Sequence, residues 1–125
     1  MKEDHTPSEG ELVILSALWA QPNSSVREVH EYVSKAKEVG YTTILTQLQR
    51  MHKKELVIRT KQGKQHLYRA ALERKNVESS LLSRLSDSVF GGSPVRLALS
   101  ALGQEKPKPE ELEELQRWLD QQKND

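Results

Sequence analysis

Apolar residues recur at helical spacing in two stretches near the start of the chain, and the same short motif opens both. Ser8 precedes Glu11 by three residues and Ser25 precedes Glu28 by three, which is the spacing of a capping box at a helix N-terminus. The apolar stripes that follow are Leu12, Leu15, Leu18 and Trp19 in the first stretch, and Val26, Val29, Tyr32 and Val33 in the second. This pattern predicts a helix over residues 8–20, ended by Gln-Pro-Asn, and another helix from residue 25 onward.

A third helix is predicted over residues 42–54, within the stretch YTTILTQLQRMHKKEL. On a helical wheel its apolar residues fall in one sector: Ile44, Leu45, Leu48 and Met51. The opposite sector carries Thr42, Thr46, Gln49, Arg50 and Lys53, with Thr43 at its edge. Gly40 is the expected connector and Thr42 the expected N-cap. Two helices separated by a short turn predict a helix-turn-helix.

Two short segments rich in β-branched and aromatic residues follow the third helix, and Gln-Gly-Lys lies between them. Gly63 can adopt the positive φ of a tight hairpin turn. The sequence therefore predicts a β-hairpin over residues 57–69, although the alternation of Val57 and Ile58 is imperfect.

The remainder of the chain returns to a helical pattern that is too thin to enclose a core. Val77, Leu81, Leu85 and Val89 recur at four-residue steps before Gly-Gly-Ser-Pro at 91–94, and two further short apolar stripes flank Lys-Pro-Lys-Pro at 106–109. Proline in that spacer prevents the preceding helix from continuing. We therefore expect residues 72–125 either to pack on residues 1–71 or to pair with a second copy.

Three helices followed by a hairpin is the order of a winged helix-turn-helix, so the expected fold is mainly α: a winged domain at 1–71 and a three-helix region at 72–125. The polar side of helix 42–54 then faces the DNA major groove, and the hairpin wing lies on the backbone. The expected DNA-binding residues are Thr42, Thr43, Thr46, Gln47, Gln49, Arg50, Lys53, Lys54, Arg59, Lys61 and Lys64. The alternatives are an ordinary solvated surface helix, or a winged-helix module that binds a protein and no DNA.

Charge and composition narrow these choices. The net charge is only +1, yet residues 50–69 contain Arg50, Lys53, Lys54, Arg59, Lys61, Lys64 and Arg69 against the single acid Glu55, which favours an anionic partner at one place. The chain has no cysteine, its histidines lack metal-ligand spacing, and no nucleophile motif occurs. We therefore expect that the protein is not an enzyme and that it binds no cofactor or metal. No apolar run resembles a membrane span or a signal peptide, so a cytoplasmic protein is expected.

Three segments in the right order resemble the penicillinase repressor family of bacterial winged-helix regulators, which includes the methicillin-resistance and copper-operon repressors. These are PSEGELVILSALW at the start, YTTILTQLQRMHKKELV at the recognition helix, and QGKQHLYRA at the wing. The resemblance implies a homodimer on a palindromic DNA operator. It matches Thr43 and Thr46 to threonines that meet bases, Arg50 to the arginine after them, and Lys53 and Lys54 to a basic pair. Glu55 replaces the usual glycine.

The resemblance also implies that the C-terminal helices form the dimer. The apolar residues expected there are Leu81, Leu82, Leu85, Val89, Leu97, Leu102, Leu112, Leu115, Trp118 and Leu119. At the level of the family alone, it implies a membrane sensor metalloprotease as a partner that cuts the repressor at Asn-Phe. Ser100 and Ala101 occupy that position here, so β-lactam-triggered cleavage is not assigned. The cysteine cluster of the copper-responsive members is absent as well.

Overall fold

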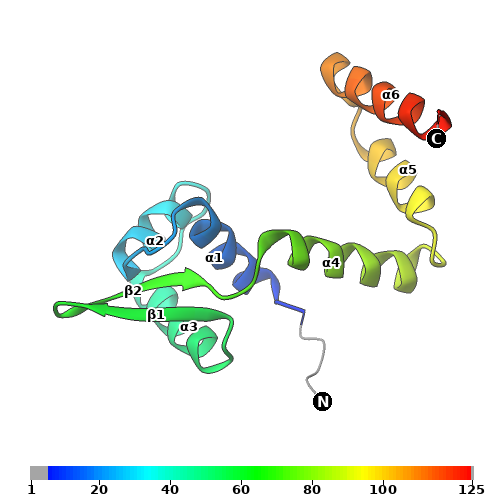
Figure 1. The fold of residues 1–125 in the computed structure, drawn as a ribbon. Helices are drawn as coiled ribbons and strands as arrows, with labels where there is room; N and C mark the ends of the chain where they lie inside the picture. The colour runs from blue at the N-terminus through cyan, green and yellow to red at the C-terminus, as the bar shows by residue number, and fades with distance from the viewer. Residues whose placement is uncertain (1–5, 125) are drawn as a thin grey trace. The chain divides into compact units, whose positions relative to one another are not determined.

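The computed structural model describes residues 6–124, which form six helices and one two-stranded hairpin (Figure 1). The chain divides into two compact units between Leu81 and Leu82. This division falls within α4 (Arg74–Val89). The expected boundary after residue 71, between a DNA-binding domain and a dimerisation region, stays a prediction.

The first unit begins with the helices α1 (Glu9–Ala20), α2 (Val26–Ser34) and α3 (Tyr41–Lys53). Both predicted capping boxes are present. The Ser8 and Ser25 hydroxyls each accept the backbone N–H three residues later at 3.2 Å, and the Glu11 and Glu28 carboxylates accept the serine N–H groups at 2.8 Å. A serine cap of this kind stabilises a helix by about 1 kcal/mol. The sequence predicted these starts correctly because both partners lie within one turn.

The prediction that Thr42 caps α3 is wrong. Gly40 is the N-cap, with no side-chain hydrogen bond, and the helix starts at Tyr41. The reason lies outside the helix. His30 Nε2 lies 2.8 Å from the carbonyl oxygen of Val39, and the His30 ring makes an edge contact with the Tyr41 ring. These two contacts hold the chain on either side of Gly40 against α2, so Thr42 falls within the first turn.

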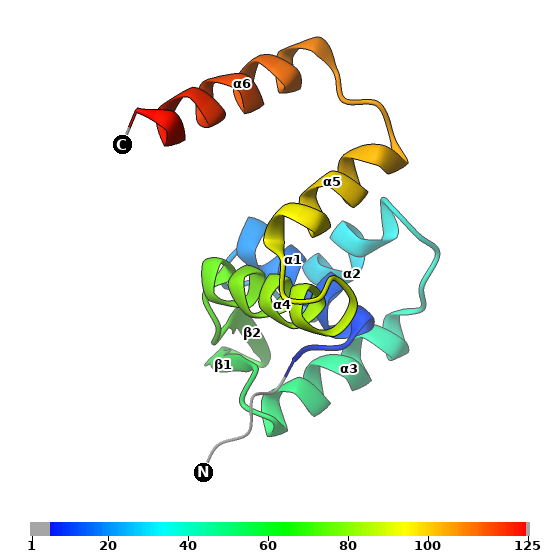
Figure 2. The ribbon, with the colours of Figure 1, turned by 90° about the vertical axis from the view of Figure 1, so that its right-hand side faces the viewer.

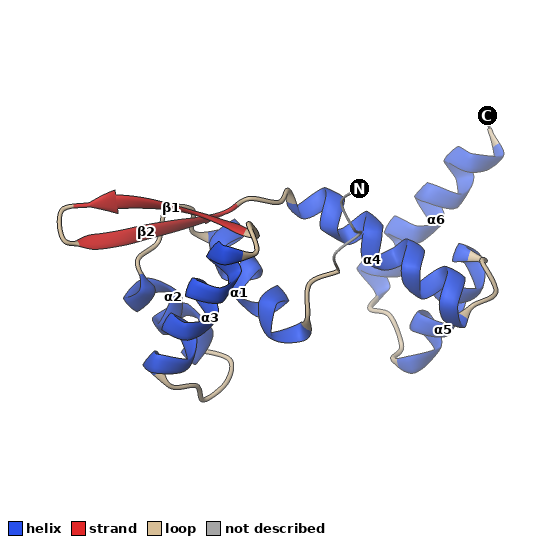
Figure 3. Cartoon of the chain, turned by 90° about the horizontal axis from the view of Figure 1, so that it is seen from below, coloured by secondary structure: helices blue, strands red, loops and turns tan. Residues whose placement is uncertain are grey.

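The hairpin consists of β1 (Val57–Gln62) and β2 (Gln65–Ala70), which pair antiparallel, with Gly63 at a φ of 63° in the turn. This confirms the predicted wing. Figures 1 and 3 show the hairpin beside α1, α2 and α3, with its turn extending past them. Ser24, in the loop between α1 and α2, pairs with Tyr68 through hydrogen bonds of 2.9 and 2.7 Å. The loop thus joins the edge of the hairpin and fixes its position on the helices.

The core of the first unit is formed by one cluster of apolar side chains from all three helices and the hairpin. Leu15, Leu48 and Met51 are completely buried, and Tyr68 is nearly so. Leu45 differs from its prediction, because it is only half-buried and lies outside this cluster. Trp19 donates its indole N–H to the carbonyl oxygen of Leu72 at 2.9 Å, which attaches the end of α1 to the segment before α4.

The second unit contains the C-terminal part of α4, α5 (Pro94–Gln104) and α6 (Pro109–Lys123), as the helical pattern predicted. Gly91 and Gly92, both with positive φ, follow α4, and the Ser93 hydroxyl caps α5 by accepting the N–H of Arg96. Figure 2 shows an extended segment separating α5 from α6. No residue of α5 or α6 is buried.

Candidate nucleic-acid interface

Apart from Tyr41 and the half-buried Leu45, the side chains of α3 that lie outside the core are polar, and none of them is acidic. Ile44, Leu48 and Met51 point into the core. The outward side carries Thr46, which is half-buried, and a set of exposed residues: Thr42, Thr43, Gln49, Arg50 and Lys53. Hydroxyl, amide and guanidinium groups are the donors and acceptors that read base edges and contact phosphates. The side of α3 predicted to face DNA is therefore free of any side chain of its own that would repel a phosphate backbone.

The register of the hairpin determines which wing residues lie on the side of α3. Partners across an antiparallel pair point to the same face, and successive residues alternate. Arg59 pairs with Tyr68 and Lys61 pairs with His66, so these residues share the face that buries Tyr68 in the core. The opposite face carries Ile58, Thr60, Leu67 and Arg69. Two of the predicted phosphate contacts, Arg59 and Lys61, thus lie on the face that covers the helices.

Two hollows join α3 to the wing, and Arg59 lines both. One is formed with the C-terminal half of α3, from Thr46, Gln49, Arg50, His52 and Lys53. The other includes the start of α3 and the turn of the wing, with Tyr41, Leu45, Lys64 and His66. The fold therefore brings together cations that are distant in sequence. Sequence reasoning missed Tyr41, Leu45, His52 and His66; the position of His66 opposite Lys61 follows from a hairpin centred on Gly63.

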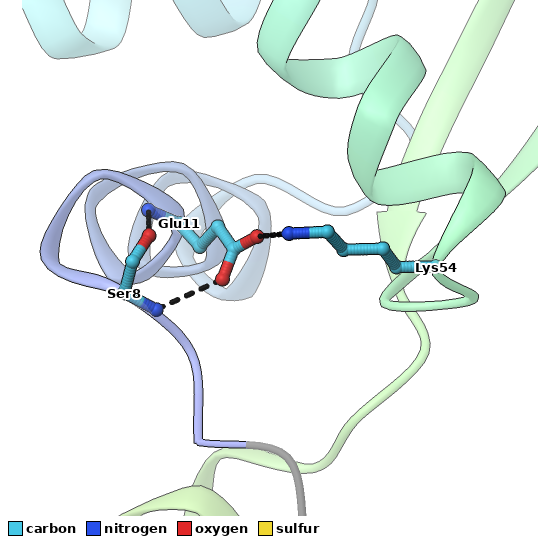
Figure 4. Close-up of polar contacts among 3 residues, drawn as sticks. All are labelled: Ser8, Glu11 and Lys54. Carbon is cyan, nitrogen blue, oxygen red and sulfur yellow. Dashed lines mark hydrogen bonds and ion pairs between the residues drawn. The ribbon is translucent and has the colours of Figure 1, made fainter.

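Two predicted contact residues lie on another side of α3, next to α1. Lys54 Nζ lies 2.8 Å from Glu11 Oε2, in an ion pair whose carboxylate side chain is only 5% exposed (Figure 4). Gln47 lies close to Gly10, where an added Cβ would come within 3.3 Å of the Gln47 amide nitrogen. The structure thus brings Arg50 and Lys53 together with the wing residue Arg59, whereas Lys54 pairs with Glu11 of α1 and Gln47 lies close to Gly10.

Glu55 occupies the position where the resemblance leads one to expect glycine, and it adopts a left-handed conformation with a φ of 65°. Its N–H donates to the carbonyl oxygen of His52 at 3.1 Å, and the N–H of Leu56 donates to that of Met51 at 2.9 Å. This is a Schellman motif, complete with the apolar contact that Met51 and Leu56 supply as buried residues. The helix end is therefore retained, at the cost of placing a side chain where glycine is favoured.

Among residues 6–124, no three His, Cys, Asp or Glu side chains are grouped so that they could hold a metal ion. None of the helices described there is long and apolar enough to cross a membrane.

Comparison with known proteins decides the family. The family model described as "Penicillinase repressor" matches residues 7–121. The chain belongs to the penicillinase repressor family. This family consists of transcriptional repressors and not of enzymes.

Relatives in this family include the penicillinase repressor of Staphylococcus aureus, 26% identical over 112 residues that make up 90% of this chain and 89% of that protein. The methicillin resistance regulatory protein MecI of the same species, strain N315, is 24% identical over 90% of this chain and 91% of its own. The transcriptional regulator BlaI of Mycobacterium tuberculosis (strain H37Rv) is 33% identical over 73 residues, 58% of this chain and 53% of that protein.

Solved structures agree with the fold. The monomeric form of BlaI from Bacillus licheniformis, in complex with the blaP half-operator, has a TM-score of 0.51 and 26% identity over 61% of this chain and 93% of that chain. A MarR family protein from Bacillus stearothermophilus has a TM-score of 0.55 over 97% of this chain and 76% of that chain, at 18% identity, which supports the fold alone. The predicted winged helix-turn-helix with a helical C-terminal region is thereby confirmed.

Proposed function

We propose that this penicillinase repressor family member represses transcription by binding a palindromic DNA operator as a homodimer. Helix α3 enters the major groove and the hairpin lies along the phosphate backbone. The observation that carries the proposal is the acid-free outer side of α3 beside the cationic face of the wing, joined to it through the two hollows that Arg59 lines. BlaI, which resembles this chain in fold and sequence, is seen with a half-operator.

The residues divide into readers of sequence and contacts to the backbone. Thr42, Thr43 and Thr46 are short enough to bring α3 close to base edges, and Gln49 can make paired hydrogen bonds to adenine. Arg50, one turn after Thr46, can bind guanine through two parallel hydrogen bonds. The cations on Lys53, Arg59, Lys61 and Lys64 neutralise phosphates, which supplies affinity that depends steeply on salt.

The C-terminal helices, within residues 72–125, form the dimer. Seven of the ten apolar residues expected at the interface are exposed in the single chain: Leu82, Leu85, Val89, Leu102, Leu112, Trp118 and Leu119. Leu81, Leu97 and Leu115 are half-buried. Each large apolar side chain moved from water into an interface stabilises the assembly by about 1.5–3 kcal/mol. A surface of this kind is typical of a subunit interface, and two-fold symmetry then places two α3 helices on two half-sites about one helical turn apart.

This proposal places the protein in the cytoplasm, where a bacterial chromosome is accessible. It does not include a membrane sensor metalloprotease as a partner, since Ser100 and Ala101 stand where the family has its Asn-Phe cut position. The inducing signal is a separate question from operator binding.

The test is selection of bound duplexes from a random DNA pool, followed by a binding titration of the selected sequence. We expect a palindromic consensus with half-sites about 10 base pairs apart and a dissociation constant that rises steeply with salt. Failure to enrich any sequence, together with no retention on DNA or heparin resin, would contradict DNA binding and favour a module that binds a protein.

A further inference from the structure

Two apolar side chains lie on the wing side of α3, within the surface assigned to DNA. Tyr41 is 47% exposed and Leu45, one turn later, is half-buried. Leu45 is neither part of the buried core cluster nor among the partly buried residues packed against it. Exposing apolar surface costs free energy, and core packing does not account for this pair.

The Tyr41 ring is held in place before any partner binds. It meets the His30 ring edge to face, with centroids 5.8 Å apart and an interplanar angle of 70°. His30 is itself fixed by the contact of its Nε2 with the carbonyl oxygen of Val39 at 2.8 Å. An aromatic side chain held in this way binds a partner without losing further rotamer freedom.

The surroundings of the pair indicate the chemistry of the partner. Tyr41 and Leu45 line the same hollow as Gln49, Arg59, Lys64 and His66, and no acidic side chain is present among the residues that line it. An apolar pair bordered by cations and by the threonines of α3 fits a polyanion that carries a small apolar group. In the DNA major groove that group is the 5-methyl of thymine.

We propose that Leu45 and Tyr41 read thymine methyl groups in the operator, so that these two residues help to determine sequence specificity. This inference rests on the proposed function, since it assumes that α3 lies in the major groove. It adds a contact by shape and apolar burial to the hydrogen bonds made by Arg50 and Gln49. The pair is four residues apart on one side of the helix, which lets both side chains reach neighbouring base pairs.

The experiment replaces each thymine of the selected operator in turn by deoxyuridine, which removes only the methyl group. For the wild-type protein we expect the dissociation constant to rise about threefold to fivefold at one or two positions per half-site, the effect of losing one buried methyl. In the Leu45→Ala variant, deoxyuridine at one of these positions should no longer raise the dissociation constant. In the Tyr41→Ala variant, the same should hold at the neighbouring position. Tyr41→Phe, which keeps the ring, should retain the wild-type sensitivity.

Ile58→Ala is the matched control, because Ile58 is an exposed apolar residue on the opposite face of the wing. It should leave the sensitivity to deoxyuridine unchanged, and circular dichroism of each variant verifies folding. If deoxyuridine at every thymine left the wild-type dissociation constant unchanged, the inference would be overturned and the repressor proposal would stay intact. The same holds if the Leu45→Ala and Tyr41→Ala variants were as sensitive to deoxyuridine as the wild-type protein. A wild-type protein that selects no sequence at all would overturn both.

Discussion

Lys54 Nζ lies 2.8 Å from Glu11 Oε2 and so attaches the C-terminal end of α3 to the first turn of α1. The same carboxylate accepts the N–H of Ser8 through its other oxygen, and it is almost fully buried. Figure 4 shows the Glu11 carboxylate between Ser8 and Lys54. A buried carboxylate requires partners of this kind, so we expect the pair to help hold α3 in place on α1.

We therefore expect Lys54→Ala to lower the free energy of unfolding by about 1–2 kcal/mol, since it removes the ion pair that Lys54 makes with a buried carboxylate. The adjacent Lys53→Ala is the control: Lys53 is exposed beside Arg50 in the hollow, so its removal should weaken DNA binding and change stability by less than about 0.5 kcal/mol. Urea denaturation measures both. Equal stability of the two variants would contradict a positioning role for Lys54.

Replacing Glu55 by glycine should stabilise the protein by about 1 kcal/mol. The φ of 65° at this residue costs a non-glycine side chain roughly that amount. Glu55→Ala separates conformation from charge, because it removes the carboxylate but keeps a Cβ. We expect thermal unfolding to shift upward for the glycine variant alone. If alanine stabilised the protein as much as glycine, electrostatic repulsion and not backbone strain would be the cause.

Local patterns in the sequence were sufficient for much of the fold, and contacts between distant residues account for what they missed. The two capping boxes and the Gly63 turn are decided within a few residues. The Glu11–Lys54 pair joins residues 43 positions apart, and no local pattern distinguishes Lys54 from Lys53.

The start of α3 shows the same limit. It depends on His30 in the preceding helix, so the N-cap propensity of Thr42 was misleading. Leu45 lies at the edge of the apolar sector, where a helical wheel cannot decide between core and surface. The turn at Gly63 fixes the register of the hairpin. The sequence was therefore sufficient to deduce that Arg59 and Lys61 lie on the same face of the wing as Tyr68.

Arg50→Ala should reduce discrimination between the operator and mismatched DNA by about 1–3 kcal/mol, because a bidentate contact to one base is lost. Binding titrations against the operator and single-base variants measure the effect. Unchanged discrimination would show that the outer side of α3 does not read bases.

Lys61→Ala should behave differently. It should weaken binding to all sequences alike, and the slope of log affinity against log salt should become shallower by about 0.9. Thr60→Ala is the neighbouring control, since Thr60 points to the opposite face of the hairpin, and it should leave the slope unchanged. A Lys61 variant with the wild-type slope would show that this face of the wing does not touch phosphates.

Trp118→Glu should convert the proposed dimer to a monomer, because a charge placed in an apolar interface is costly to bury. Trp118 is 55% exposed in the single chain, and no residue of α6 is buried, so the substitution removes nothing from the core of the first unit. Sedimentation at micromolar concentration should show half the wild-type mass with unchanged helical content, and operator affinity should fall because each α3 then binds its half-site alone. Gln121→Glu adds the same charge three residues further along α6 and should leave the dimer intact. A wild-type protein that sediments as a folded monomer would mean that these apolar residues serve another partner, and the two-fold operator would lose its physical basis.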